Sequence, residues 1–257
     1  MFRTGLVSIS FRQNTVEEIV AAVREAGLQE IEWGSDVHVL PGNEQRTAAV
    51  RELMEQNGLR TAAYGSYYEL GKSTNPQADF APYLQTAIWL GAPVIRIWAG
   101  NKDSAQLSEA EWDALANEAR LLARMALEQG VKISLECHPY TLTDDYEASL
   151  RFLQLVDCEG LTMYWQPNQN CSFAYNLLAA KALAPDTTNL HVFSWDMVNG
   201  VLERYPLSRH QERWKEYLNI FASTGGSHAL LLEFMHDDRL ETLKETAATL
   251  LEWTNAE

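Results

Sequence analysis

Cysteine, basic residues and long apolar runs are all scarce in this chain of 257 residues. The three cysteines, Cys137, Cys158 and Cys171, are an odd number without a Cys-x-x-Cys spacing, which argues against a disulfide framework and predicts a reducing compartment. No stretch approaches the roughly 18 apolar residues of a membrane helix, and residues 1–10 lack the apolar run of a signal peptide. We therefore expect a cytoplasmic protein without a membrane span.

Positive charge is scarce because 20 Lys and Arg stand against 35 Asp and Glu, which gives a formal net charge of −15. Such a surface repels the phosphates of nucleic acids and the head groups of anionic lipids, so we expect neither a nucleic acid nor a membrane as partner. The motifs HExxH and GxSxG are absent, which disfavours zinc peptidases and serine hydrolases. The expected partner is therefore a small molecule.

Short β-rich runs alternate with amphipathic helical stretches along the whole chain. Strands are predicted at residues 5–9, 30–33, 60–64, 94–98, 132–136, 161–166, 190–193 and 229–234. Helices are predicted at residues 15–26, 44–57, 80–90, 108–130, 144–156, 176–183, 213–223 and 239–252. This alternation, in units of about 30 residues, predicts an α/β fold, a (β/α)8 TIM barrel with eight parallel strands in a single domain over residues 1–257.

Local signals support this reading of the elements. Thr15 with Glu18, and Ser108 with Glu111, have the spacing of capping boxes that begin helices. A doubly wound open sheet is the alternative fold, but the residues after the first strand, SISFRQN, lack the phosphate-binding glycines common there. Residues 195–210 are the longest irregular stretch late in the chain, and we predict an active-site loop there.

Polar side chains end the last four predicted strands, where a barrel of this kind carries its chemistry. Side chains alternate along a strand, and this alternation turns Glu136, Gln166, His191 and Glu233 into the barrel. Each of them alone is compatible with an ion pair or a core hydrogen bond. Two carboxylates that meet at a barrel mouth, however, need a counter-charge. Oxygen ligands with one imidazole suit Mn²⁺, Mg²⁺, Co²⁺ or Zn²⁺, so the pattern predicts a divalent metal site.

The segments ISLECH, YWQPN, NLHVFSW and LLLEFM resemble those of the xylose isomerase-like sugar phosphate isomerase and epimerase barrels. The resemblance extends over essentially the whole chain and implies one divalent metal ion held by Glu136, Gln166, His191 and Glu233. It also implies that Glu136 and Glu233 are the catalytic acid and base. In that mechanism one glutamate removes a proton from carbon to give an enediolate, and a glutamate returns it at another carbon or face. The implied substrate is a ketose, a sugar phosphate or a related polyol.

The sequence departs from the family pattern at several positions. The usual aspartate of the sixth strand and the histidine three residues later are replaced by Gln166 and Gln169. Members of the family often have a glutamate beyond the fifth strand, and this sequence has Leu142 at that position. They also have an arginine after the histidine ligand, where this sequence has Met197. An amide oxygen is neutral and binds a hard cation more weakly than a carboxylate does, so we expect a lowered metal affinity.

Substrate-binding residues are predicted from aromatic and basic side chains near the strand ends. Aromatic rings stack on the apolar faces of sugars and exclude water. Arg96 either holds a substrate anion or pairs with Glu32 or Glu136, and the pattern favours the ion pair. The predicted substrate-binding set is Trp98, His138, Arg96, Tyr64 and Trp195.

Several alternatives to an isomerase or epimerase stay open. An enediolate beside a leaving hydroxyl can lose water, so a keto-polyol dehydratase of the inosose type is compatible with the same residues. A non-catalytic sugar-binding protein with a degraded metal site is compatible with Gln166. Barrels of this group that cut abasic DNA are disfavoured by the net charge of −15. The sequence leaves the number of subunits open and is compatible with a homo-oligomer.

Overall fold

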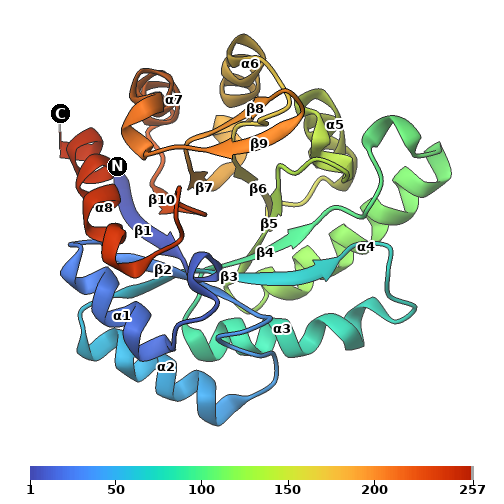
Figure 1. Cartoon of the computed structure of the whole chain (residues 1–257). Helices are drawn as coiled ribbons and strands as arrows, with labels where there is room; N and C mark the ends of the chain where they lie inside the picture. The colour runs from blue at the N-terminus through green and yellow to red at the C-terminus, as the bar shows by residue number, and fades with distance from the viewer. Residues whose placement is uncertain (256–257) are drawn as a thin grey trace.

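Eight parallel strands close into a barrel in the computed structural model, which describes residues 1–255 (Figure 1). The last two residues of the predicted domain, 256 and 257, lie outside the described part. The strands follow one another around the barrel in chain order, and β1 closes it by pairing with both β2 and β10. The barrel strands are β1 (Phe2–Val7), β2 (Glu30–Gly34), β3 (Arg60–Glu69), β4 (Val94–Trp98), β5 (Lys132–Glu136), β6 (Leu161–Trp165), β7 (Thr187–Val192) and β10 (His228–Leu232). The predicted (β/α)8 barrel is confirmed.

A ring of helices surrounds the strands (Figure 1). They are α1 (Val16–Glu25), α2 (Glu44–Gln56), α3 (Pro76–Leu90), α4 (Glu109–Leu127), α5 (Tyr146–Val156), α6 (Phe173–Leu183), α7 (Gln211–Ser223) and α8 (Leu240–Asn255). Within the described residues, no helix combines the length and the apolar character that crossing a bilayer requires.

Both predicted capping boxes are present. The Thr15 hydroxyl accepts a hydrogen bond from the backbone N–H of Glu18, whose carboxylate accepts one from the Thr15 N–H in return. Ser108 and Glu111 make the same pair of bonds at the start of α4. Helix α3 begins earlier than predicted, at Pro76, because proline has no N–H to satisfy and its fixed φ suits a first helical turn.

Two of the eight barrel strands have the predicted boundaries, and β2 is longer than predicted by one residue, Gly34. Strands β4 and β5 begin and end at the predicted residues. The first strand, predicted over residues 5–9, ends at Val7 because Ser8–Phe11 turn into a 3₁₀ helix. Strand β3 continues to Glu69 instead of ending at Tyr64, so it reaches further past the barrel mouth.

Apolar side chains form two layers, one between the strands and the helices and one inside the barrel. The outer layer is the larger and includes Trp165, which contacts the rings of Trp214, Tyr217 and Phe221. The buried members of the inner layer are Val7, Ile9, Ala62, Ala63, Val94, Tyr164, Ala229 and Leu231. Buried charged side chains also lie inside the barrel, among them Glu32, Arg96 and His191.

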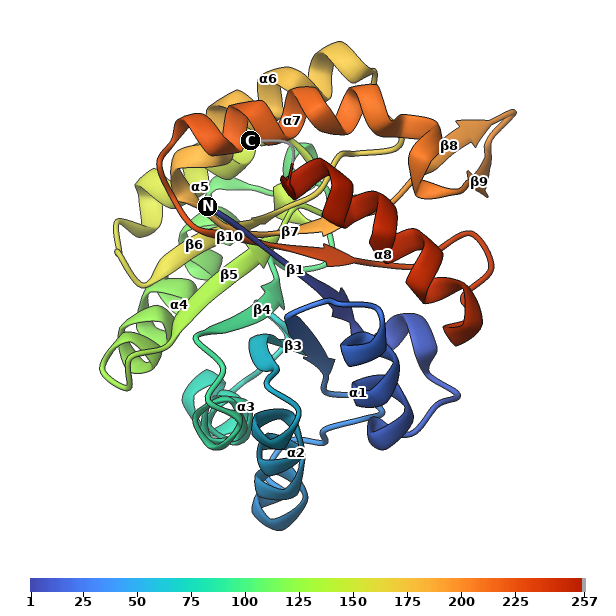
Figure 2. The same ribbon diagram turned by 90° about the vertical axis from the view of Figure 1, so that its left-hand side faces the viewer.

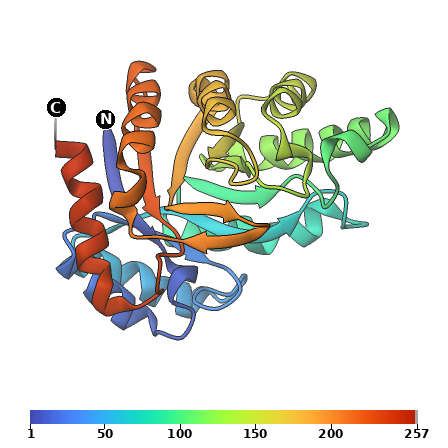
Figure 3. The ribbon, with the colours of Figure 1, turned by 45° about the horizontal axis from the view of Figure 1, so that its top comes forward.

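Residues 195–210 form a β-hairpin followed by a 3₁₀ turn, which corrects the prediction that this segment is irregular. Strand β8 (Trp195–Val198) pairs antiparallel with β9 (Val201–Arg204). Asn199 and Gly200 have φ values of 52° and 79°, as a two-residue hairpin turn requires. The hairpin projects from the side to which the barrel strands point (Figure 2) and lies beside the barrel mouth (Figure 3).

Candidate metal centre

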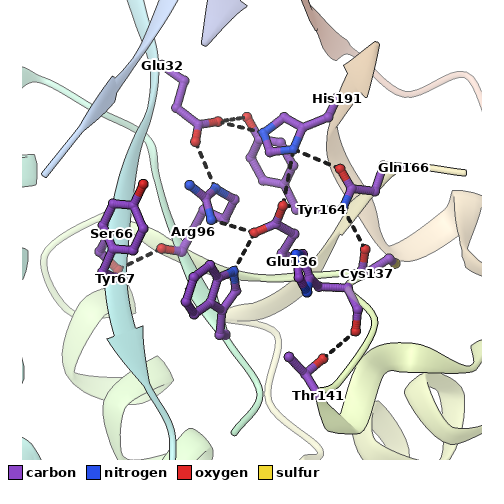
Figure 4. A network of polar contacts seen from close by, with 12 residues as sticks. Glu32, Ser66, Tyr67, Arg96, Glu136, Cys137, Thr141, Tyr164, Gln166 and His191 are labelled. Atoms are coloured by element: carbon purple, nitrogen blue, oxygen red, sulfur yellow. Dashed lines mark hydrogen bonds and ion pairs between the residues drawn. The ribbon is translucent and has the colours of Figure 1, made fainter. Parts of the chain in front are cut away.

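The four predicted ligands meet at the carboxyl ends of β5, β6, β7 and β10, as Figure 4 shows for three of them. Single ligand atoms of Glu136, His191 and Glu233 lie within 4.8 Å of one another. The amide oxygen of Gln166 lies 3.2 Å from Nδ1 of His191, on the same side of the imidazole as both glutamates. All four side chains are buried, so they form one enclosed polar cluster.

Glu136 is held in place through one of its two carboxylate oxygens. Oε2 accepts hydrogen bonds from Nη1 of Arg96 at 2.5 Å and from Nε1 of Trp98 at 2.6 Å. Oε1 faces the cluster and lies 3.4 Å from Nδ1 of His191. One oxygen of Glu136 is therefore fixed by neighbouring strands, and the other is directed at the centre.

Gln166 is oriented by its amide nitrogen. Nε2 donates to the backbone carbonyl of Cys137 at 2.9 Å and to Oε1 of Glu136 at 3.3 Å. These two bonds turn the amide oxygen toward His191. The replacement of a carboxylate by an amide at this position thus leaves an oxygen directed at the centre, although an uncharged one.

Glu32 supports the opposite side of the imidazole, a role that the sequence pattern does not predict. Its Oε2 lies 3.3 Å from Nε2 of His191 and accepts a hydrogen bond from the Tyr164 hydroxyl (Figure 4). Its Oε1 accepts a hydrogen bond from Nε of Arg96 at 2.8 Å. Arg96 therefore bridges Glu32 and Glu136, and its 2 % exposure leaves it little access to a substrate. The ion pair that the sequence favoured for Arg96 is confirmed. The inward position of Glu32 on its strand was the sequence signal that it could support His191.

The ionisation of the cluster follows from burial opposed by close charges. Burial alone would raise the pKa of Glu32, but Arg96 and His191 lower it to about 2. The same two residues, against burial, hold the pKa of Glu136 below its ordinary range. Burial and the repulsion from Glu136 raise the pKa of Glu233 to about 7. Burial disfavours the imidazolium of His191, yet Glu233 and Glu32 raise its pKa to about 10.

The donor set fits a divalent cation. Three oxygens, from Glu136, Gln166 and Glu233, lie 3.2 to 3.4 Å from Nδ1 of His191. Ligand atoms that share a metal at about 2.1 Å are themselves about 3 to 3.4 Å apart. Two carboxylates, one amide oxygen and one imidazole also match the chemistry of Mg²⁺, Mn²⁺, Co²⁺ or Zn²⁺. The raised pKa of His191 indicates that this arrangement of carboxylates favours a positive charge at its centre.

The predicted substrate residues Trp98 and His138 lie at the mouth. Both are half-buried, and their rings lie 5.6 Å apart. The indole N–H of Trp98 is bonded to Glu136, and Nδ1 of His138 lies 2.6 Å from the carbonyl oxygen of Pro139. These two side chains form one wall beside the candidate metal ligands.

Tyr64 does not lie at the mouth, which corrects its predicted substrate contact. It is fully buried between the barrel and the helices, and its hydroxyl donates to the carbonyl of Val39 at 2.7 Å. A register shift between β2 and β3, at Ile31 and Glu32, changes the alternation that a regular strand would have. The tyrosine that reaches the mouth is Tyr67, on the extension of β3, and its ring lies 5.4 Å from that of Trp98.

Trp195 anchors the hairpin at the mouth. Its ring stacks on Phe193, with centroids 3.8 Å apart, and its N–H donates to the carbonyl of Phe234 at 3.0 Å. Arg204 of β9 lies over the same ring and pairs with Asp238 at 2.5 Å. The predicted residue therefore holds the hairpin against the ends of β7 and β10.

Comparisons with known proteins agree with this architecture. The model of the family described as xylose isomerase-like TIM barrel matches residues 20–256. A 3-dehydroshikimate dehydratase of Bacillus anthracis is 31% identical over 165 residues, which are 61% of this chain and 59% of that protein. The match thus spans less than two thirds of that relative.

Solved structures extend the likeness in fold to the whole chain. The probable 3-DHS dehydratase AsbF of Bacillus anthracis has a TM-score of 0.80 and 20% sequence identity, with 100% of both chains covered. A xylose isomerase-like TIM barrel protein of Mycobacterium smegmatis, in complex with magnesium, has a TM-score of 0.71 and 15% identity, covering 95% of this chain and 90% of that one. At these identities the likeness concerns the fold.

Proposed function

Because the chain belongs to the xylose isomerase-like TIM barrel family, we propose that it is a divalent-metal-dependent dehydratase of a hydroxylated keto acid. The observation that carries the proposal is the convergence of Glu136, Gln166, His191 and Glu233 on one point of the barrel mouth. The name of the relative, a 3-dehydroshikimate dehydratase, favours water loss over isomerisation among the functions that the sequence left open.

Glu136, Gln166, His191 and Glu233 would hold the cation, which would polarise the ketone and its neighbouring hydroxyl. Arg96 and Trp98 fix Glu136 as a ligand, because they occupy its second oxygen. Glu233 is better suited to proton transfer than Glu136, since its pKa is raised to about 7 and that of Glu136 is lowered.

The proposed reaction has two steps. Glu233 accepts a proton from the hydroxyl-bearing carbon next to the ketone, and the electron pair left behind forms an enediolate. This pair then expels the hydroxyl of the following carbon, which leaves as water on receiving the proton from Glu233. One C–H and one C–O bond break, one C=C bond forms, and the substrate loses one water molecule.

The test is the mass of the product formed from 3-dehydroshikimate by protein that has been stripped of metal and reloaded with Mn²⁺, Mg²⁺, Co²⁺ or Zn²⁺. We expect the loss of one water, which after rearrangement to the aromatic ring gives 3,4-dihydroxybenzoate. Glu233→Gln is expected to lower kcat by about 100-fold or more because the proton acceptor is lost. Glu136→Gln is expected to lower both turnover and metal content.

The control for these variants is Glu241→Gln, at a carboxylate that is 74% exposed on α8. It is expected to leave turnover unchanged. Full turnover by both site variants would refute the proposal, as would a metal-free protein with undiminished activity.

An isomerase or epimerase is the second candidate, and the presence of two glutamates, Glu136 and Glu233, within 3.4 Å of Nδ1 of His191 favours it. A second glutamate could return the proton at another carbon or face of the enediolate. In that case ketoses or sugar phosphates would be converted without a change of mass, and deuterium from D₂O would enter the product. A product of unchanged mass in H₂O that carries carbon-bound deuterium after reaction in D₂O would favour the isomerase and refute the dehydratase.

A further inference from the structure

A guanidinium that the proposed chemistry does not use lies at the barrel mouth. Arg12 follows the 3₁₀ turn after β1, so its side chain starts at the carboxyl end of a barrel strand. It forms an ion pair with Asp36, which follows β2, and donates a hydrogen bond from Nη2 to the Tyr67 hydroxyl at 2.5 Å. The side chains of Arg12 and Asp36 are 36% and 30% exposed, so this pair is open to solvent.

Arg12 is connected to the candidate metal centre through two aromatic side chains. Tyr67, which accepts the hydrogen bond from Arg12, lies near Arg96 and Glu136 in Figure 4. Its ring meets that of Trp98 edge to face at 5.4 Å, and the Trp98 N–H donates to Glu136 at 2.6 Å. Arg12 and Glu136 thus lie on one continuous wall of the mouth.

The two arginines of this wall differ in what they can still bind. Arg96 is buried between two carboxylates, which use its charge and its donors. Arg12 faces one carboxylate in a solvent-exposed pair, and such pairs are weak because water competes for both partners. A guanidinium has five N–H donors in a planar fork, so a second carboxylate can join or replace Asp36.

We propose that Arg12, positioned by Asp36 and Tyr67, is a subsite for the carboxylate of the substrate. The inference rests on the proposed function, because it places the reacting keto group at the cation and the acid group at Arg12, further along the same wall. The substrate class is then small hydroxylated carboxylic acids, in preference to neutral sugars. Asp36 holds the guanidinium in position until a substrate carboxylate takes its place.

Binding of two matched probes to metal-loaded protein, measured by calorimetry, tests the subsite. The probes are 3,4-dihydroxybenzoate and catechol, which share two adjacent hydroxyls and differ in the carboxylate. Hydrogen bonds to charged groups correspond to about a 10- to 100-fold change in affinity, so we expect the wild type to prefer the acid by that factor. Arg12→Gln is expected to remove the preference without weakening catechol binding.

Two further variants sharpen the test. Asp36→Asn removes the competing carboxylate and is expected to strengthen binding of the acid several-fold, whereas Arg12→Lys keeps the charge, loses the fork and is expected to retain part of the preference. The matched control is Arg46→Gln, because Arg46 is also a partly exposed arginine in an ion pair but lies on α2, where it pairs with Glu17 of α1. It is expected to behave as the wild type.

The subsite is overturned if the wild type does not prefer the acid, if it binds neither probe, or if Arg12→Gln weakens both probes alike. Turnover of 3-dehydroshikimate separates this inference from the proposed function. Dehydration with an unchanged KM in Arg12→Gln would remove the subsite and keep the dehydratase. An acid preference that depends on Arg12, without dehydration, would keep the subsite and remove the dehydratase.

Discussion

Gly65 on β3 leaves the space that the buried ion pair of the site occupies. A Cβ atom at this position would lie 2.4 Å from Oε1 of Glu32 and 2.9 Å from Nη2 of Arg96. Glu32 faces His191, and Arg96 holds Glu136. The positions of the two candidate ligands, His191 and Glu136, therefore depend on this space. A residue without a side chain thus contributes to the position of two candidate ligands.

Gly65→Ala is expected to destabilise the protein by about 2 kcal/mol, since the added methyl group displaces a fully buried ion pair. Urea unfolding measures the loss, and calorimetry with Mn²⁺ is expected to show a weakened metal affinity. The control is Gly58→Ala, where φ is 70° and no atom lies within 4 Å of the added Cβ. It is expected to cost backbone strain of about 1 kcal/mol and to leave metal binding unchanged. Equal metal affinity in Gly65→Ala and the wild type would contradict this account.

At the scale of elements, the hairpin β8–β9 is the main addition to the plain barrel. Its Asn199–Gly200 turn is a strong local signal for a hairpin, and apolar residues on both sides of it support the pairing. The alternation of strands with helices predicts only parallel barrel strands, so it does not predict this antiparallel pair. The sequence does not show where the hairpin docks. Its position is set by the contacts of Trp195 with Phe193 and Phe234.

Trp195→Ala is expected to loosen the hairpin while the barrel stays folded. Losing a stacked aromatic pair costs about 0.5 to 1.5 kcal/mol, so local opening should become roughly 2- to 10-fold more frequent. Limited proteolysis at the 199–200 turn measures this, with the melting temperature as a check on global stability. Met197→Ala, at an exposed hairpin residue, is the control. Cleavage of Trp195→Ala at the wild-type rate would show that the tryptophan does not anchor the hairpin.

At the scale of the whole molecule, buried charge in the mouth links stability to pH. The protonated imidazole of His191 has a pKa raised from 6.5 to about 10, so its stabilising effect is complete below about pH 6.5 and is lost as pH rises to 10. Glu233, with a pKa raised to about 7, adds to the loss between about pH 4.5 and 7. Glu32 acts in the opposite sense, and its contribution is lost as pH falls from 4.5 to about 2.

The melting temperature of metal-free protein is therefore expected to fall from about pH 6 to about pH 9. A bound cation replaces the proton as the positive charge at the centre, so saturating Mn²⁺ is expected to raise the melting temperature and to flatten this decline. Calorimetric melting curves with EDTA or with Mn²⁺ provide the comparison. Parallel pH profiles under the two conditions would refute the link between the cation and the carboxylate cluster.

The sequence by itself determined the barrel and the meeting of Glu136, Gln166, His191 and Glu233. These features follow from a period of two along each strand and from the parallel order of the strands, both of which are local properties of the chain. Only the tertiary structure decided that Tyr67 reaches the mouth in place of Tyr64, because a register shift depends on how two strands pair. Contacts across the barrel also decided that Glu32 faces His191 and that Asp36 meets Arg12. The period along a strand says that Glu32 points inward, but it does not say which distant residue the side chain meets.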